Sequence, residues 1–262
     1  MEYHPHMLKS LDILTSALNE EDCIQELYSQ LNQVMLHNPN WSWRLIICDN
    51  GSKDLTWNKI NNLCRVNSNV IGIRMSRTFE LDEAFACAID YSDADAAVIM
   101  TSDLQDPPEL ISQFLELYEQ GFEQVMVRIT SRNEVPPLRR FLSKTYYRIA
   151  KRLTNNAILS GVSDYRFLTR NVVLALKEMK ERQRFFRGLA NIAGFKATII
   201  ETERAPRFAG ESKFMKAKLT RLTSFAARSN LNHTTATLEL KSAIGTLASL
   251  LSSASTLIIA II

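Results

Sequence analysis

The alternation of strand-like and helix-like segments over the first two-thirds of the chain limits its fold more than any other feature. Five short apolar runs have the length and composition of buried strands. They cover residues 11–15, 44–48, 70–75, 96–100 and 124–129. The segments between them place apolar residues at helical spacing. The chain is therefore predicted to be an α/β protein whose mostly parallel sheet has helices on both faces.

Four helices are predicted between these strands. The first follows the cluster Asn19-Glu20-Glu21-Asp22, whose side chains are expected to cap its N-terminus. Its predicted buried face consists of Ile24, Leu27, Leu31, Val34 and Met35. Asp54 is expected to cap the second helix, and the other two cover residues 82–91 and 108–120.

Two aspartates stand where predicted strands end. Asp49 ends the second strand in the turn Asp49-Asn50-Gly51-Ser52, and Asp103 follows the fourth strand. Ligands of parallel α/β sheets bind beyond the carboxyl ends of the strands, so both carboxylates are candidate binding groups at one rim. Two structural explanations stay open. Asp49 could form an Asx-turn with Gly51, alone or while also facing a ligand. Asp103 and Asp106 could cap the following helix.

The alternation weakens after residue 132. The run Gly161-Val162-Ser163-Asp164-Tyr165-Arg166 interrupts the periodicity, and residues 197–202 are predicted to form the last strand. Residues 204–228 then carry seven Lys or Arg and one acid, Glu211, with apolar residues at helical spacing. This composition is typical of a basic amphipathic helix on a membrane surface. The alternative is a solvated helix that packs its apolar side on the domain.

Residues 242–262 contain no charged residue and end in a strongly apolar stretch. That length is just enough for a helix to cross a bilayer, so a transmembrane helix is predicted, with a buried C-terminal helix as the alternative. The positive charges before it predict that the preceding domain lies in the cytoplasm. Four cysteines without CxxC spacing favour reduced thiols, in agreement with that location. The net charge of +3 is too small to indicate nucleic-acid binding.

Five sequence blocks occur in the order and with the gaps of one known family. They are Asn19-Glu20-Glu21, Asp49-Asn50-Gly51-Ser52-Lys53-Asp54, Asp103-Leu104-Gln105-Asp106-Pro107-Pro108-Glu109, Ser163-Asp164-Tyr165-Arg166 and Arg207-Phe208-Ala209-Gly210-Glu211-Ser212-Lys213-Phe214. In these blocks the chain resembles the family-2 glycosyltransferases of GT-A fold, in the branch of the dolichol-phosphate mannose synthases and bactoprenol glucosyltransferases.

This resemblance implies inverting transfer of a hexose from a UDP- or GDP-sugar to a polyprenyl phosphate at the cytoplasmic membrane face. It implies a GT-A (Rossmann-like) glycosyltransferase domain at 1–203 and a basic amphipathic juxtamembrane segment at 204–236. A transmembrane helix at 237–262, either complete or truncated, is expected to follow. A homo-oligomer is compatible with this organisation by analogy with relatives.

The resemblance also implies a role for each matching side chain. Asp103 and Gln105 are expected to hold Mg²⁺ or Mn²⁺, which offsets the charge that develops on the leaving diphosphate. Asp164 and Arg166 are expected at the reacting centre, with an ion pair between them as the alternative. The residues expected to bind the donor are Asn19, Glu20, Asp49, Ser76, Arg77 and Ser102. The acceptor phosphate is anionic and suits cationic groups. The residues expected to bind it are Arg128, Arg132, Arg204, Arg207, Ser212 and Lys213.

Four positions depart from the family pattern. Asn50 stands where a second acid is usual, Thr101 where an aspartate is usual, and Ser16 where a proline is usual. The segment Arg77-Thr78-Phe79-Glu80 lacks the usual glycine. Losing a carboxylate is expected to weaken a magnesium site without abolishing it, since Mg²⁺ takes one or two carboxylates plus substrate phosphates. Two other functions therefore stay open. One is a catalytically degenerate relative that binds nucleotide or lipid phosphate without sugar transfer, and the other is a soluble nucleotide-binding protein that packs its tail inside.

Overall fold

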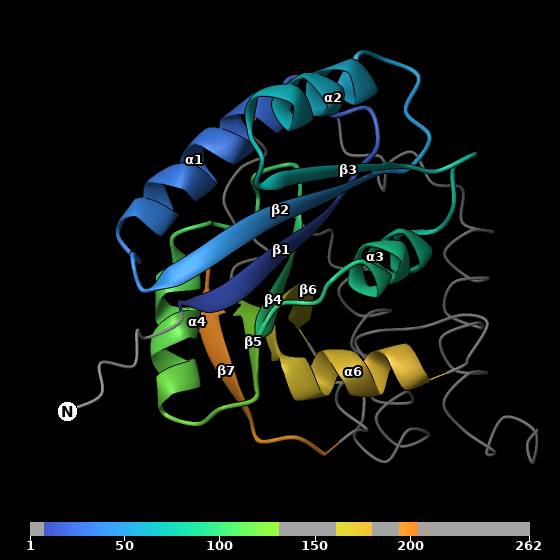
Figure 1. Cartoon of the computed structure of the whole chain (residues 1–262). Helices are drawn as coiled ribbons and strands as arrows, with labels where there is room; N and C mark the ends of the chain where they lie inside the picture. Colours follow the sequence, from blue (N-terminus) through green and yellow to red (C-terminus); the bar gives the residue numbers. More distant parts are fainter. Residues whose placement is uncertain (1–7, 131–160, 180–193, 204–207, 209–262) are drawn as a thin grey trace, which may run out of the picture. The chain divides into compact units, whose positions relative to one another are not determined.

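The computed structural model describes residues 8–130, 161–179, 194–203 and 208 (Figure 1). All of them lie in one compact unit, which comprises Met1–Val135 and Ser160–Ser212. In chain order the elements are β1 (Lys9–Ala17), α1 (Ile24–Leu36), β2 (Trp41–Asp49), α2 (Thr56–Val66), β3 (Val70–Arg74), α3 (Leu81–Asp90), β4 (Ala96–Thr101), α4 (Leu110–Glu119), β5 (Gln124–Ile129), β6 (Val162–Thr169), α6 (Arg170–Glu178) and β7 (Ala197–Thr202).

Seven strands of the described residues form one sheet in the order β3-β2-β1-β4-β6-β5-β7. Neighbouring strands are parallel except where β6 is involved, because β6 runs antiparallel to both β4 and β5. Helices α1, α2 and α4 pack on one face of the sheet, and α3 and α6 pack on the other (Figure 1). The predicted mostly parallel sheet with helices on both faces is confirmed.

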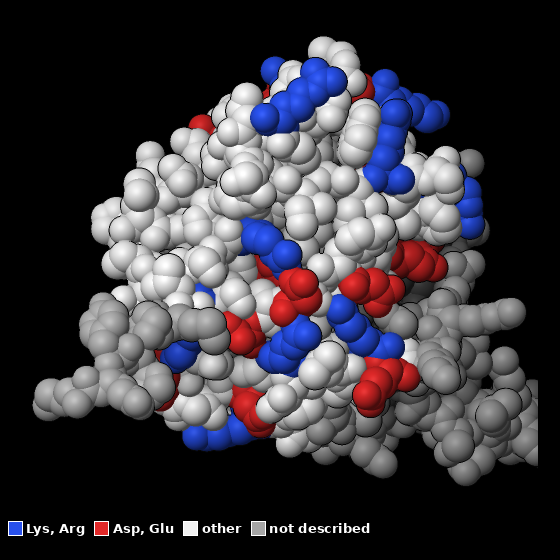
Figure 2. All heavy atoms as spheres, viewed as in Figure 1, with Lys and Arg blue, Asp and Glu red and all other residues white. Residues whose placement is uncertain are grey.

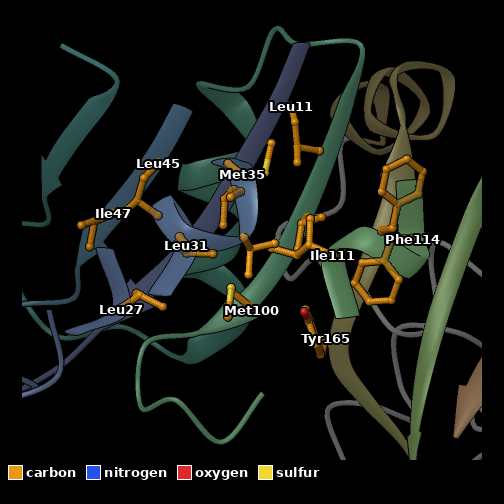
Figure 3. Close-up of a cluster of buried hydrophobic side chains, with 14 of the residues drawn as sticks. Leu11, Leu27, Leu31, Met35, Leu45, Ile47, Met100, Ile111, Phe114 and Tyr165 are labelled. Carbon is orange, nitrogen blue, oxygen red and sulfur yellow. The ribbon is translucent and has the colours of Figure 1, made fainter. Parts of the chain in front are cut away.

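Helix α1 buries the face that its sequence predicts. Its buried residues are Ile24, Leu27, Leu31, Val34 and Met35, the set that recurs at helical spacing. Figure 3 shows Leu27 and Leu31 close to Leu45 and Ile47 of β2. The predicted cap is wrong, however, because α1 begins after Cys23 and no side chain caps it. The cluster 19–22 instead contacts the loop that follows β2.

Strand β6 is the main element that the periodicity did not indicate. The run 161–166, interpreted as a break, is the beginning of this strand and contains Asp164 and Arg166. Arg166 is only 1% exposed, and its guanidinium donates hydrogen bonds to the carbonyl oxygens of Ser163 (3.2 Å) and Asp164 (3.3 Å). A buried arginine within a strand hides the alternation of polar and apolar residues from which strands are recognised. Strand β6 lies between β4 and β5 and runs antiparallel to both, whereas the other neighbouring strands of the described sheet are parallel.

A buried carboxylate joins the strands near their amino ends. Asp12 of β1 is 0% exposed, and Arg44 of β2 donates to it through Nε (2.8 Å) and a terminal nitrogen (2.9 Å). The Ser92 hydroxyl and the backbone N–H groups of Asp93 and Ala94 donate to the same carboxylate at 2.9–3.2 Å. Hydrogen bonding to Asp12 raises the pKa of Arg44. Five donors on the two carboxylate oxygens compensate the buried charge and tie the segment before β4 to β1 and β2.

The membrane segments predicted from the sequence lie outside the described residues, apart from Phe208. Within the parts of the chain that the structure describes, no helix has the length and apolarity needed to cross a bilayer. The four cysteines are free thiols, and burial raises the pKa of Cys48 and of Cys64.

We expect Asp12→Asn to lower the free energy of unfolding by about 2–3 kcal/mol. The amide keeps the size of the side chain but puts N–H groups against donors and removes the buried one of the two carboxylates that pair with Arg44, leaving Asp93. Urea denaturation followed by circular dichroism measures the change. Asp22→Asn at an exposed position is the matched control and is expected to unfold like the wild type. Equal stability of the Asp12 and Asp22 variants would contradict a structural role for the Asp12 network.

Candidate functional site

The register of the parallel strands brings the ends of β1, β2 and β4 to one rim of the sheet. Ala17 pairs with Asp49, and Ser16 pairs with Thr101, two residues before Asp103. The Ser102 hydroxyl donates to the carbonyl oxygen of Ser16 at 2.9 Å and so joins the loop after β4 to the end of β1. Asp49 and Asp103 therefore lie at the same rim, as the sequence predicts.

Only one of the two carboxylate oxygens of Asp49 accepts a hydrogen bond from the described residues. Oδ1 accepts the backbone N–H of Ser52 at 3.0 Å, so the expected turn is present. Oδ2 is buried and receives no hydrogen bond from the described residues. The nearest cation is the exposed Arg74, whose Nε lies 3.7 Å from Oδ2. A buried carboxylate oxygen without a donor is costly, and it can accept a hydrogen bond from a ligand.

Gly51 allows two loops to meet beside Asp49. Its φ is +75°, and a Cβ at this position would lie 2.8 Å from the backbone carbon of Arg77 and from the backbone nitrogen of Thr78. A side chain therefore fits neither the backbone conformation nor the space. The loop after β3 consequently packs directly on the turn after β2.

These two loops border a hollow of about 590 Å³. Its described lining residues are Gly51, Ser52, Lys53, Arg74, Met75, Ser76, Arg77 and Thr78. Acidic and basic side chains are interleaved on the face drawn in Figure 2, whereas this lining includes three cations and no acid. A concave surface lined by one sign of charge attracts a ligand of the opposite sign. The hollow is therefore suited to an anion.

The loop after β1 is held against the turn after β2. Asn19 has a φ of +48°, and its Oδ1 accepts the N–H of Lys53 at 2.8 Å. Its own N–H donates to the hydroxyl of Ser52 at 2.9 Å, and the N–H of Glu20 donates to the hydroxyl of Thr56 at 2.8 Å. The side chain of Asn19, which was expected to help cap α1, is used in the first of these contacts. The contacts place Asn19 and Glu20, two predicted donor-binding residues, next to residues that line the hollow or adjoin it.

The acidic loop after β4 is organised around Thr101. The Thr101 hydroxyl lies 2.8 Å from Asp103 Oδ1 and 2.7 Å from Asp106 Oδ2, and its one proton can be donated to only one of them at a time. Asp103 Oδ1 also accepts the N–H of Gln105 at 3.2 Å. Helix α4 begins with Glu109 as its N-cap, so the alternative in which Asp103 or Asp106 caps this helix is wrong.

The oxygen atoms of this loop are ligands of the kind that Mg²⁺ and Mn²⁺ take in proteins. They belong to the carboxylates of Asp103 and Asp106, the side-chain amide of Gln105 and the hydroxyl of Thr101. Among the described residues, no three His, Cys, Asp or Glu side chains are grouped as a metal site. The donor set nevertheless fits a cation that completes its coordination with water and with phosphate oxygens of a ligand.

Asp164 lies beside the acidic loop because β6 runs antiparallel to β4. Ile99 pairs with Arg166. In the same direction from this pair, Thr101 comes two residues after Ile99 on β4, and Asp164 comes two residues before Arg166 on β6. Asp164 is half-buried at the start of β6, and the guanidinium of Arg166 binds its carbonyl oxygen. Arg166 thus holds the backbone that carries Asp164.

The expected acceptor-binding residues lie mostly outside the described residues. Arg128, the described one, lies on β5 and forms an ion pair with Glu201 of β7 at 2.9 Å. The N–H of Phe208 is 3.5 Å from the carbonyl oxygen of Asp103, which brings residue 208 to the acidic loop. Those for which the structure gives no position are Arg132, Arg204, Arg207, Ser212 and Lys213.

Sequence reasoning missed three residues at this rim. Lys53 and Arg74 line the hollow, and Asn50 hydrogen-bonds the backbone of Phe79. Arg74 ends β3, so its position at the carboxyl end of a strand was a usable signal. The contact of Asn50 depends on how the two loops meet, and no local pattern indicates it.

A family model described as Glycosyl transferase family 2 matches residues 12–176. An uncharacterized glycosyltransferase of Synechocystis sp. is 32% identical over 213 residues, which are 81% of this chain and 67% of that protein. A protein of Escherichia coli named prophage bactoprenol glucosyl transferase homolog is 29% identical over 209 residues, 80% of this chain and 68% of the relative. The matched segments thus span about two-thirds of the length of these relatives.

A solved structure has a similar arrangement of elements. Glucosyl-3-phosphoglycerate synthase from Mycobacterium tuberculosis, in complex with Mn²⁺, UDP-glucose and phosphoglyceric acid, superposes with a TM-score of 0.55. The match covers 85% of this chain and 79% of that one at 16% sequence identity. Likeness at this identity shows a common fold.

We expect Gly51→Ala to destabilise the protein more than Gly121→Ala does. Both glycines have positive φ, but the nearest atom to a Cβ at position 121 is the end of Lys196 at 3.7 Å. The Gly121 variant is expected to lose about 1 kcal/mol of unfolding free energy, and the Gly51 variant about 1–2 kcal/mol more because backbone must move. Chemical denaturation of both variants measures the difference. Equal losses would show that the loops do not meet closely at Gly51.

Proposed function

This chain belongs to glycosyl transferase family 2, and we propose that it transfers a hexose from a UDP- or GDP-sugar to a polyprenyl phosphate at the cytoplasmic face of a membrane. Its fold is the GT-A-like α/β fold. The observation that carries the proposal is the buried Oδ2 of Asp49, which accepts no hydrogen bond from the described residues, beside a cation-lined hollow and at the same rim as Asp103.

The hollow supplies complementary groups for a nucleoside diphosphate. Asp49 Oδ2 accepts a hydrogen bond from an N–H or O–H group of the nucleoside, which removes the cost of leaving that oxygen without a hydrogen-bond donor. Lys53, Arg74 and Arg77 provide positive charge for the phosphates. Asn19, Glu20, Ser76 and Ser102 belong to loops at the same rim, which supports their assignment to the donor site.

Asp103 and Gln105 are the residues that would hold Mg²⁺ or Mn²⁺ on the donor side. Their oxygen atoms suit such a cation, and the mycobacterial structure with the same fold contains Mn²⁺ together with UDP-glucose. When bound, the cation supplies positive charge to the leaving diphosphate. Thr101 keeps the Asp103 carboxylate in place through its hydroxyl.

The acceptor is proposed from the relatives, several of which are named bactoprenol glucosyl transferases. A phosphate oxygen of the lipid attacks the anomeric carbon opposite the leaving group, so a carbon–oxygen bond forms with inversion as the bond to the nucleoside diphosphate breaks. Since the second pKa of a phosphate monoester is about 6, the nucleophile is largely ionised at neutral pH. Asp164 accepts the remaining proton from the singly ionised form, and Arg166 acts through it by holding its backbone.

Cationic residues are proposed to bring the anionic acceptor to the anionic donor. Arg128 pairs with Glu201 in this structure and would exchange that partner for the lipid phosphate. Arg132, Arg204, Arg207, Ser212 and Lys213 are assigned to the same phosphate from their sequence blocks. The N–H of Phe208, the described residue of the 207–214 block, lies 3.5 Å from the carbonyl oxygen of Asp103, and this contact supports the assignment.

The membrane organisation is also part of the proposal. The catalytic domain covers 1–203, the basic amphipathic segment 204–236 and the transmembrane helix 237–262, with the domain in the cytoplasm. The motivation is the charge and hydropathy of these segments. A homo-oligomer would multiply the membrane contacts of such an anchor.

A second candidate function is supported by Thr101. A hydroxyl replaces a carboxylate in the acidic loop, which lowers the negative charge available to a divalent cation. A family member of this kind could bind a nucleotide or a lipid phosphate without transferring sugar. The two functions differ in one measurable respect, which is turnover.

We expect a labelled hexose to appear on undecaprenyl phosphate when the protein is incubated with UDP- or GDP-hexoses and Mn²⁺. Asp103→Asn should lower kcat at least about a hundredfold, because it removes the carboxylate assigned to the cation. Its control is Asp22→Asn, which makes the same change at an exposed position and should keep full turnover. Nucleotide binding without any product across the donor panel would favour the non-catalytic alternative. Unchanged turnover of the Asp103 variant would refute its metal role.

We expect the full chain to float with anionic liposomes more strongly than a chain truncated after Asn230. The truncated form retains basic residues but loses the apolar segment, so its binding should fall more steeply as salt is added. Sucrose-gradient flotation at two salt concentrations measures both effects. Identical flotation of the two forms would remove residues 231–262 from the proposed anchor.

A further inference from the structure

The side chain of Asn50 forms two hydrogen bonds with the backbone of one residue in another loop. Its Nδ2 donates to the carbonyl oxygen of Phe79 at 3.0 Å, and its Oδ1 accepts the N–H of Phe79 at 2.8 Å. Asn50 is 4% exposed and stands 29 residues before Phe79 in the chain. We propose that Asn50 is a positioning residue that fixes segment 76–79 at the donor pocket, an inference that rests on the proposed function of that pocket.

Only a carboxamide makes both contacts of this Asn50–Phe79 pair. An amide side chain has a donor and an acceptor, whereas a carboxylate has acceptors alone. An aspartate at position 50 would keep the contact with the N–H of Phe79 and place a second oxygen against its carbonyl. Asparagine in place of the usual acid at position 50 therefore allows this side chain to hold the loop after β3.

The pair is anchored to the sheet at one end. The backbone N–H of Asn50 donates to the carbonyl oxygen of Ala17 at 2.8 Å, at the end of strand β1. One residue later, Gly51 touches the backbone of Arg77 and Thr78. Segment 76–79 is thus held in two ways by the turn that carries Asp49. Gly51 packs against its centre, and Asn50 forms two hydrogen bonds with its last residue.

The other end of the pair reaches the lining of the hollow. The guanidinium carbon of Arg77 lies 4.0 Å from the centre of the Phe79 ring, a distance at which a cation is attracted to the ring face. Ser76, Arg77 and Thr78 all line the hollow. Fixing the backbone of Phe79 therefore fixes the ring on which the Arg77 cation rests, and with it one of the charges that meets the ligand.

The expected consequence is a change in donor affinity with little change in the chemical step. When a binding-competent loop conformation is only partly populated, the apparent Kd equals the intrinsic Kd divided by the competent fraction, so it rises as that fraction falls. Loss of the Asn50–Phe79 pair should therefore raise the Kd for nucleotide and the KM for donor by about five- to tenfold. The kcat at saturating donor should stay within about twofold, since bound nucleotide restores the loop.

The experiment uses four variants of the full chain with UDP and GDP as probes in the presence of Mn²⁺. Asn50→Ala removes both hydrogen bonds without adding charge, and Asn50→Asp removes one and adds a negative charge. Phe79→Leu keeps the backbone pair but removes the ring under Arg77. Asn32→Asp, at an exposed position of α1, is the matched control for charge. Calorimetry measures Kd, and hydrogen exchange measures protection of residues 77–80.

We expect both Asn50 variants to bind nucleotide more weakly and to exchange faster at 77–80, while β1 keeps its wild-type protection. Phe79→Leu should weaken binding with normal exchange, and Asn32→Asp should match the wild type in both. Weaker binding of the Asp variant alone, with wild-type exchange, would identify charge repulsion and overturn the inference. Wild-type behaviour of Asn50→Ala, or faster exchange with unchanged Kd, would also overturn it. Absence of nucleotide binding by the wild type is the distinct result that would remove the proposed function as well.

Discussion

The pairing of β1 between β2 and β4 is the constraint on which the site depends. Parallel strands end at the same rim, so the pairs Ala17 with Asp49 and Ser16 with Thr101 decide that the two acidic loops open on one side. The Asp12 network holds the same strands near their other end. A slip of one residue in either pairing would move each side chain of the slipped strand to the opposite face of the sheet and change the relative position of the two carboxylates.

Hydrogen bonds between side chains and backbone, rather than ion pairs, assemble the donor side of the site. Asn19 binds the N–H of Lys53, Asp49 binds that of Ser52, and Asn50 binds both polar groups of Phe79. These contacts satisfy loop groups that would otherwise be unpaired in a partly buried region. Asp49 Oδ2 is the exception, since it is buried without a donor from the described residues. The loops are thus preorganised around one group that a ligand can satisfy.

Two of the four departures expected from the family resemblance, Asn50 and Thr101, share one chemical feature. Asn50 and Thr101 each replace an acid with a group that donates a hydrogen bond, to the Phe79 carbonyl in one case and to the acidic loop in the other. A carboxylate can do neither. At both positions a side chain without negative charge holds a neighbouring group in place: Asn50 holds the backbone of Phe79, and Thr101 holds the carboxylates of Asp103 and Asp106.

The sequence by itself determined the layered α/β fold, the buried face of α1 and the common rim of Asp49 and Asp103. These features follow from periodicity, because residue spacing decides which side chains face the sheet and where each strand ends. Only the tertiary structure decided the antiparallel β6, the burial of Arg166, the role of the acidic cluster 19–22 and the pairing of Asn50 with Phe79. Each of these depends on contacts between segments distant in sequence, such as Glu20 with Thr56. Local patterns do not encode such contacts, because the strand register determines which loops meet.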